Sequence, residues 1–236
     1  MITLALDTCD ARGSIALLED RRIIAENSHP SDEEYSSWLL PAVDRLLASK
    51  QISHADLAGY AVASGPGSFT GVRVGLTTVK AWAEVYSKPI VPVSRLEVLA
   101  EKSPRESGFV AAFIDAQRKQ VFGALHRRDG EVLRRVEEER VIDPNEFFRW
   151  IAKEVGGAPV VWASLDPTIL TSSSFWEARQ SKGEQVVAVE PPLAAAIGLS
   201  AMGQFSKTNS VDALTLDANY VRRSDAEIFG KKAAEK

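Results

Sequence analysis

The chain has 236 residues, 45% of them hydrophobic and 25% charged, with a net charge of −4 and a single cysteine. This composition is ordinary for a globular protein, and one cysteine excludes an intramolecular disulfide framework and fits a reducing compartment. The apolar runs are far shorter than the ~20 residues of a membrane-spanning helix, and the first residues lack a signal-peptide pattern. We therefore expect a cytoplasmic protein with no membrane segment.

The balance of charge argues against a protein that binds nucleic acid on its own. Lysine and arginine total 28, against 32 for aspartate and glutamate. Phosphate binding usually requires a basic surplus or a basic stripe, because each neutralised phosphate needs a cation. The basic pairs lie beside acids or turn residues, so we interpret them as solvated surface: Arg21-Arg22, Arg127-Arg128, Arg134-Arg135 and Arg222-Arg223. We expect any RNA to be bound mainly by a partner protein.

The first half of the chain begins with an apolar run, Ile2–Asp7, that ends in an acid, which is typical of a strand buried on both faces. The segments Ser14–Leu18 and Ile23–Glu26 flank a turn at Glu19-Asp20-Arg21, which predicts a three-stranded meander. After a helix, the pattern predicts a strand at Tyr60–Ala63, a helix from about Gly71 to Tyr86, a strand at Ile90–Val93 and a short helix to about Lys102.

The same order of elements recurs in the second half. Phe109–Asp115 is again an apolar run ending in an acid, and Asp129-Gly130 is a strong hairpin signal. Asp115 follows Asp7 by 108 residues and Asp129 follows Asp20 by 109. The strand-ending acid and the hairpin turn are thus repeated at nearly the same distance along the chain. The other expected elements are strands at Val121–His126, Val132–Val136 and Val160–Ala163, and helices at about Asn145–Val155 and Pro192–Phe205.

This repetition predicts an α/β chain built from two tandem lobes. We expect one lobe at 1–103, a second at 108–223, a polar join at 103–107 and a flexible tail at 224–236. A meander followed by alternating helix and strand, twice over, is the order of the actin-like (ASKHA, ribonuclease-H-like) fold. Such a fold does not by itself define a function.

A glycine-rich segment joins the strand at 60–63 to the next helix. Glycine permits positive φ and proline fixes a turn, so we expect a tight loop, with Thr70 as the helix N-cap and Phe69 packed on Val74. Such a loop either turns the chain or cradles an anion at the helix N-terminus. A Walker lysine and a G-x-G-x-x-G spacing are both missing, which favours the turn. The loop residues of interest are Gly65, Pro66, Gly67, Ser68, Phe69, Thr70 and Arg73.

The two helices of the first lobe carry residues suited to a protein–protein contact. Gly71 and Gly75 share one helix face, and a glycine inside a helix costs up to ~1 kcal/mol relative to alanine. We therefore expect another backbone to approach Gly75, either from the lobe's own sheet or from a second subunit. The predicted subunit interface comprises Tyr35, Trp38, Leu39, Gly71, Val74, Gly75, Thr78 and Trp82, with core packing as the alternative for most of them.

The sequence lacks the clusters expected of an active site. Its three histidines have no metal-site spacing, and no G-x-S-x-G is present. We therefore predict no catalytic residue and no bound metal. Asp7 and Thr8 lie at the end of the first strand, and Asp115 lies at the end of the equivalent strand in the second half. Actin-like ATPases hold the metal and phosphates of a nucleotide at these places. Because no phosphate-binding glycine follows Asp7, we interpret a nucleotide cleft at these three residues as vestigial.

Several motifs, taken together, resemble those of the TsaB (YeaZ) family, in the expected order along nearly the whole chain: Leu4–Thr8, Gly65–Leu76, Pro92–Glu97, Ile114–Ala116 and Ala218–Arg223. The G-P-G-S-F-T-G-V-R run is the most specific, although it also occurs in looser form in the catalytic relative TsaD. The chain departs from the family pattern near Tyr35, where a histidine is usual. Gln117 and Gln120 stand where many members have arginine and glutamate.

The resemblance implies a two-lobed actin-like fold and a non-catalytic subunit of the complex that transfers threonylcarbamoyl to the adenosine beside the anticodon of tRNAs reading A-starting codons. It implies pairing through the helices of the first lobe, with TsaD or as a homodimer when alone, in a complex that includes the ATPase TsaE. The tRNA would be bound only through the complex, with ATP and metal on the partner subunits and no cofactor here. The alternative is an autonomous ASKHA-type phosphotransferase or a glycoprotease-like metallopeptidase.

Overall fold

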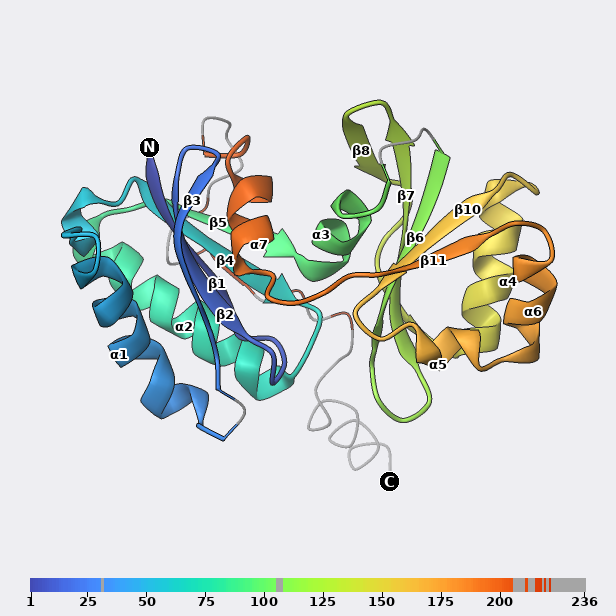
Figure 1. Ribbon diagram of the computed structural model, residues 1–236, viewed down its shortest axis with the longest axis horizontal. Coiled ribbons are helices and arrows are strands. Elements are labelled where there is room, and N and C mark those ends of the chain that lie inside the picture. Colours follow the sequence, from blue (N-terminus) through green and yellow to red (C-terminus); the bar gives the residue numbers. More distant parts are fainter. Residues whose placement is uncertain are drawn as a thin grey trace, which may run out of the picture. The chain divides into compact units, whose positions relative to one another are not determined.

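Two compact units make up the computed structural model, which describes residues 1–30, 32–104, 108–205, 211, 215–217, 219 and 221. Unit 1 combines Met1–Val98 with Pro191–Asn219, and unit 2 combines Leu99–Glu190 with Tyr220–Lys236. Each unit is built on one β-sheet with helices packed against it (Figure 1). No helix formed by the described residues is long and apolar enough to cross a bilayer.

Five strands form the sheet of unit 1: β1 (Ile2–Asp7), β2 (Ser14–Glu19), β3 (Arg22–Ser28), β4 (Gly59–Gly65) and β5 (Ile90–Ser94). Their order in the sheet is β3-β2-β1-β4-β5. β2 runs antiparallel to both β1 and β3, whereas β1, β4 and β5 are parallel. The meander and the two parallel strands predicted from the sequence are therefore confirmed.

Three helices cover this sheet: α1 (Tyr35–Ala48), α2 (Phe69–Tyr86) and α7 (Ala194–Ala201), with a single 3₁₀ turn, η1 (His54–Asp56), before β4. α1 and α2 lie side by side on one face, and α7 covers the opposite face (Figure 1). Because both faces are covered, the central strands are apolar along nearly their whole length rather than alternating.

Six strands form the sheet of unit 2: β6 (Gly108–Asp115), β7 (Val121–Asp129), β8 (Val132–Arg135), β9 (Arg140–Ile142), β10 (Val160–Ser164) and β11 (Gln185–Ala188). The order is β11-β10-β6-β7-β8, with β9 also paired to β7. β7 runs antiparallel to β6 and β8, whereas β6, β10 and β11 are parallel. The same order and directions occur in unit 1, so the predicted duplication of an actin-like lobe is confirmed.

The core of unit 2 is rich in aromatic side chains. α4 (Pro144–Val155) presents much of this core; Asp143 caps its first turn and Gly156 ends it with a φ of 58°. The short helices are α3 (Arg95–Glu101), α5 (Thr168–Thr171) and α6 (Ser174–Gln180). The buried aromatic residues are Phe113, Phe147, Phe148, Trp150, Trp162 and Trp176.

The placement of α7 differs from the sequence prediction. The helix expected at about 192–205 to complete the second lobe packs on the sheet of unit 1 instead. The predicted lobe bounds, 1–103 and 108–223, are therefore wrong for residues 191–219, which return to unit 1. The predicted tail at 224–236 lies outside the described residues.

The composition of α7 explains its position. Half of its residues are alanine, and a side chain added at Gly198 would meet Leu18 Cδ1 at 2.4 Å and Ala5 Cβ at 3.1 Å. The helix therefore lies very close to β1 and β2. Farther along the chain, Val211 forms an antiparallel bridge with Ile90 at the edge of the same sheet. Periodicity shows that a helix is apolar, but it does not show which of two sheets the helix covers.

Candidate functional site

The carboxyl edge of the unit 1 sheet brings three chain segments together. β1, β4 and β5 are parallel, so their carboxyl ends share one edge, which is where open α/β sheets usually bind ligands. We call this region the carboxyl-edge site. It consists of residues 7–13 after β1, residues 65–71 after β4, and Arg95 after β5.

Arg95 lies at the centre of the carboxyl-edge site, and its side chain is only 1% exposed. Its Nε donates to Asp7 Oδ2 at 3.1 Å and its Nη2 to Asp10 Oδ2 at 2.6 Å, while Nη1 donates to the Pro66 carbonyl at 3.4 Å. Asp7 is equally buried, and its Oδ1 accepts a bond from the Cys9 amide at 2.9 Å. One guanidinium therefore joins all three segments.

Burial and charge oppose each other at these groups. Burial raises the pKa of Asp10, but the charge and hydrogen bond of Arg95, together with the amide and charge of Arg12, outweigh this effect and hold that pKa below its ordinary value. Burial lowers the pKa of Arg95, but Asp7 and neighbouring negative groups outweigh it and the pKa is raised. Burial raises the pKa of the Cys9 thiol well above its ordinary value, and Asp7 adds to the effect. The thiol therefore stays protonated, as in an unreactive buried cysteine.

The glycine-rich loop closes over the segment that follows β1. Gly65 has a φ of 111°, and the Gly65–Pro66 peptide is cis. The Ser68 amide donates to the Cys9 carbonyl at 2.6 Å, and a side chain at Gly67 would meet that same carbonyl oxygen at 2.4 Å. The loop thus fills the space above the end of β1 with its own backbone, which agrees with its interpretation as a turn.

The start of α2 differs slightly from the expectation. Ser68, not Thr70, is the N-cap, and its hydroxyl accepts a bond from the Gly71 amide at 3.4 Å. Phe69 is therefore the first helical residue, and the guanidinium of Arg73 lies 3.7 Å from the centre of its ring. Serine and threonine both carry a hydroxyl that can accept a bond from an amide of the first turn, so the sequence could not decide between Ser68 and Thr70 as the cap.

The glycine face of α2 packs against Thr8 of the same chain. A side chain at Gly71 would meet the Thr8 carbonyl oxygen at 2.0 Å, and one at Gly75 would meet Thr8 Oγ1 at 2.4 Å. The Thr8 hydroxyl donates to the Gly71 carbonyl at 2.7 Å. The glycines therefore leave room for Thr8, directly after β1 of the same lobe: Gly71 for its backbone and Gly75 for its side chain.

This packing corrects the predicted subunit interface. Gly71 and Gly75 are buried inside unit 1, and Trp38 and Leu39 are core residues with 3% and 1% exposure, so these four cannot form a contact surface. Their helical periodicity marked a buried face, and a buried face looks the same whether a sheet or a subunit covers it. The remaining four predicted residues keep part of their surface exposed: Tyr35, Val74, Thr78 and Trp82.

Tyr35, on α1, contacts the carboxyl-edge site from outside it. Its hydroxyl donates to the Asp10 carbonyl and lies so close to Gly13 that no side chain would fit there. Its ring stacks on His29 with centroids 4.1 Å apart. Burial, followed by the charges of Asp7 and Asp10, raises the pKa of the phenol. Tyr35 therefore holds the loop after β1 against α1.

Asp115, which ends the equivalent strand of unit 2, has a different environment from Asp7. Its Oδ1 accepts a bond from the Gln117 amide at 2.7 Å and its Oδ2 one from Gln117 Nε2 at 3.2 Å. Gln117, Arg118 and Lys119 all have positive φ, between 55° and 59°. Asp115 therefore stabilises its own turn, and a nucleotide cleft that would join Asp7, Thr8 and Asp115 stays a prediction.

The histidines have separate structural environments. His54 stacks on Tyr86 with centroids 5.0 Å apart. His126, on β7, is 1% exposed, and neither of its ring nitrogens has a hydrogen-bond partner among the described residues. In the part of the chain that the structure describes, no group of three or more histidine, cysteine, aspartate or glutamate side chains could hold a metal ion.

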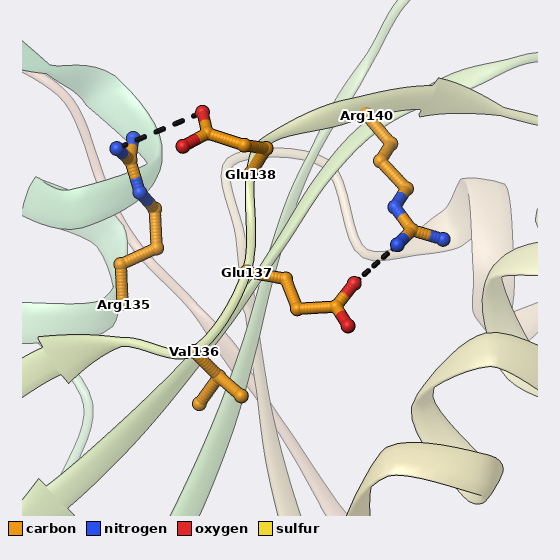
Figure 2. A pocket seen from close by; sticks show the side chains of 5 residues that line it. All are labelled: Arg135, Val136, Glu137, Glu138 and Arg140. Atoms are coloured by element: carbon orange, nitrogen blue, oxygen red, sulfur yellow. Dashed lines mark hydrogen bonds and ion pairs between the residues drawn. The ribbon is translucent and has the colours of Figure 1, made fainter.

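Unit 2 has a shallow surface pocket of about 570 Å³, lined by Arg135, Val136, Glu137, Glu138 and Arg140. Figure 2 shows that its charged side chains pair with one another: Arg135 with Glu138 at 3.9 Å, and Arg140 with Glu137. Exposed pairs of this kind stabilise little and leave few groups free to bind a ligand. The pocket is therefore a weaker candidate than the carboxyl-edge site.

Sequence reasoning did not identify Arg95 as a site residue. Its partners Asp7 and Asp10 lie 88 and 85 residues away in the chain, so local spacing carries no information about the contact. One signal was available. Arg95 directly follows the buried parallel strand β5, and Asp7 ends the parallel strand β1 at the same edge of the sheet. The combination of a cation and an acid at one sheet edge predicts an ion pair.

Comparison with known proteins shows that the chain is similar to proteins named for tRNA modification. Residues 23–160, more than half of the chain, match the family model described as TsaD, tRNA N6-adenosine threonylcarbamoyltransferase. The tRNA threonylcarbamoyladenosine biosynthesis protein TsaB of Bacillus subtilis is 38% identical over 58% of this chain and 59% of its own length. TsaB of Escherichia coli is 34% identical over 61% and 63%. The chain thus spans about 60% of the length of these curated relatives.

Solved structures match over nearly the whole chain. YeaZ from Pseudomonas aeruginosa aligns with a TM-score of 0.74 and 25% identity, covering 93% of this chain and 99% of that one. The ROK hexokinase of Thermus thermophilus aligns with a TM-score of 0.50 at 13% identity, a likeness of fold alone.

Replacing Gly75 should destabilise the fold. We expect Gly75→Leu to lower the free energy of unfolding by about 1–3 kcal/mol or more, because the new side chain would overlap Thr8. The matched control is Thr77→Leu on the exposed face of α2, which should change stability by about 0.5 kcal/mol or less. Urea unfolding measures both. A Gly75→Leu variant with wild-type stability and lost self-association would instead place Gly75 at an interface.

His126 should make unit 2 sensitive to acid. Burial, then the charges of Arg135 and Arg128, lower the pKa of His126 to about 4. As pH falls below about 6.5, the unfolded chain binds this proton before the folded chain does, so stability falls between about pH 6.5 and 4. At 1.36 kcal/mol per pKa unit the loss approaches about 3 kcal/mol. Urea unfolding across pH, compared with His126→Leu, measures it; parallel profiles would contradict the assignment.

Proposed function

We propose, because this chain belongs to the TsaB (YeaZ) family, that it is the non-catalytic subunit of the complex that transfers threonylcarbamoyl to the adenosine beside the anticodon of tRNAs reading A-starting codons. The observation that carries the proposal is the whole-length match to a solved YeaZ structure, since the curated relatives match over only part of their length. In this proposal the chain pairs with the catalytic subunit TsaD, in a complex with the ATPase TsaE, and forms a homodimer when alone.

The carboxyl-edge site supports a non-catalytic role. The Asp7 carboxylate is bound by Arg95, and the Thr8 hydroxyl donates to the chain's own Gly71 carbonyl. These two side chains are therefore engaged internally rather than directed at a substrate. In the proposed complex the ATP, the metal and the transfer chemistry belong to the partner subunits, and this chain supplies binding surface.

The outer face of α1 and α2 supports pairing. Trp82 is held in place by neighbouring rings, with centroids 4.7 Å from His54 and 5.8 Å from Tyr60. One turn further along α2, Val85 is 72% exposed. Apolar surface of this kind, around a braced tryptophan, suits a protein–protein contact. We define the pairing surface as Tyr35, Leu40, Val74, Thr78, Trp82, Val85 and Tyr86.

The charge of the chain supports an indirect contact with RNA. A net charge of −4 leaves no surplus of cations to neutralise phosphates. The tRNA would therefore reach this chain only through the complex, in the cytoplasm where tRNA is modified. Of the autonomous alternatives, a phosphotransferase gains support from fold likeness alone. For a metallopeptidase, the described residues offer no group of three or more side chains that could hold the metal.

Reconstitution tests the proposed function. With threonylcarbamoyl-adenylate, tRNA, TsaD and TsaE present, omitting this chain should abolish formation of threonylcarbamoyladenosine, measured by mass spectrometry of digested tRNA. Supplying the chain without TsaD should give no product, because the proposed catalytic groups are on TsaD. Product formed by this chain alone would overturn the non-catalytic role.

The pairing surface can be tested by adding one charge. We expect Val85→Asp to weaken association with TsaD, or with a second copy, by roughly tenfold or more, because the contact would then bury an unpaired carboxylate. Analytical ultracentrifugation measures the association. Val132→Asp, at a residue 49% exposed on β8 of unit 2, is the matched control and should leave association unchanged. An equal effect of both variants, or none from Val85→Asp, would reject the surface.

A further inference from the structure

The actin-like fold implies a nucleotide and its metal ion at the carboxyl edge of the first sheet, and the residues of this chain do not fit them. The acid that ends β1 is already neutralised by Arg95. The hydroxyl of Thr8 donates to Gly71, and the Ser68 amide donates to Cys9. The carboxylate that could bind a cation, and the hydroxyl and amide that could bind a phosphate, thus already have hydrogen-bond or ion-pair partners within unit 1.

We propose that Arg95 is a built-in cation, which occupies the position that a divalent metal ion would take between Asp7 and Asp10. Its two donor nitrogens lie 3.1 Å from Asp7 Oδ2 and 2.6 Å from Asp10 Oδ2, so both carboxylates surround one positive charge. Unit 1 therefore holds its carboxyl edge together without metal or nucleotide. This inference concerns the isolated chain and stands whether or not the chain is a partner subunit.

Electrostatics requires a cation at this position. Asp7 is buried, and a second carboxylate lies on the same guanidinium. Asp10 also faces Arg12, whose Nη2 lies 3.4 Å from Asp10 Oδ2, but Arg95 is the cation bonded to the buried Asp7 and the one that lies between the two carboxylates. Without Arg95, the two carboxylates would repel each other across the site. Removal of one partner from a buried pair leaves an uncompensated charge, which strongly destabilises a fold.

A guanidinium supplies something that a metal ion does not. It is planar, carries five N–H donors and stays charged at every pH of interest. The third donor contact of Arg95, 3.4 Å to the Pro66 carbonyl, fixes the loop that leads into α2. A permanently bound cation keeps this loop in one arrangement, whereas an exchangeable ion would release it on dissociation.

The test replaces the charge and then offers a metal. Arg95→Met keeps an extended side chain but removes the cation, so the thermal midpoint of the full chain should fall by roughly 10 °C in metal-free buffer. Millimolar Mn²⁺, Mg²⁺ or Ca²⁺ should then raise that midpoint by several degrees, because Asp7 Oδ2 loses its cation and Asp10 Oδ2 keeps the longer, 3.4 Å contact with Arg12. The wild-type midpoint should not respond to these ions or to magnesium–ATP.

Two controls separate the ion site from a general effect. Asp7→Asn combined with Arg95→Met lacks one carboxylate and should show no response to metal, and Arg95→Lys retains a cation and should show none either. If Arg95→Met does not fold in buffer, its refolding from urea is measured with and without Mn²⁺, and recovery only with the ion supports the proposal. An equal metal response in the wild type, or no response in Arg95→Met by either measurement, overturns it.

Discussion

The buried ion pair between Arg95 and Asp7 is the constraint on which the arrangement of unit 1 depends. Both side chains are 1% exposed, and charges removed from water so completely are tolerated only when their donors and acceptors are satisfied. The remaining groups of the pair are satisfied by Asp10, by the Cys9 amide and by the Pro66 carbonyl. Each of these partners lies on a loop, so the pair dictates where the loops run.

The ion pair holds the loops close to the end of β1, and this close packing explains the glycines near it. The glycine-rich loop after β4 packs on the segment that follows β1. Gly67 therefore lies against Cys9, and Gly71 and Gly75 lie against Thr8. Larger side chains at these positions would separate α2 from the sheet. The inner face of α2 is thereby fixed by unit 1 itself, and only its outer face, including Trp82 and Val85, is left for the pairing that we propose.

The sequence predicted what local pattern can determine. Apolar runs and the Asp129-Gly130 turn located the strands, and the repeated offset predicted two equivalent sheets. Contacts between distant segments were not predictable in this way. Periodicity showed that α7 is apolar but not that it covers β1 and β2, and it showed a glycine face on α2 but not that Thr8 fills it. The position of Arg95 directly after a parallel strand suggested an ion pair at that sheet edge, but the local sequence did not show that Asp7 and Asp10 are its partners.

The two lobes show how one duplicated position acquired two environments. Unit 1 has Arg95 directly after its fifth strand in chain order, whereas the corresponding strand of unit 2, β11, is followed by Val189, a buried apolar residue. Asp7 can therefore be fully buried, since a cation lies beside it. Asp115 instead remains half-buried and bonds to the Gln117 of its own turn. A strand-end acid without an internal cation must stay near solvent or bind an external one, and this rule accounts for both environments.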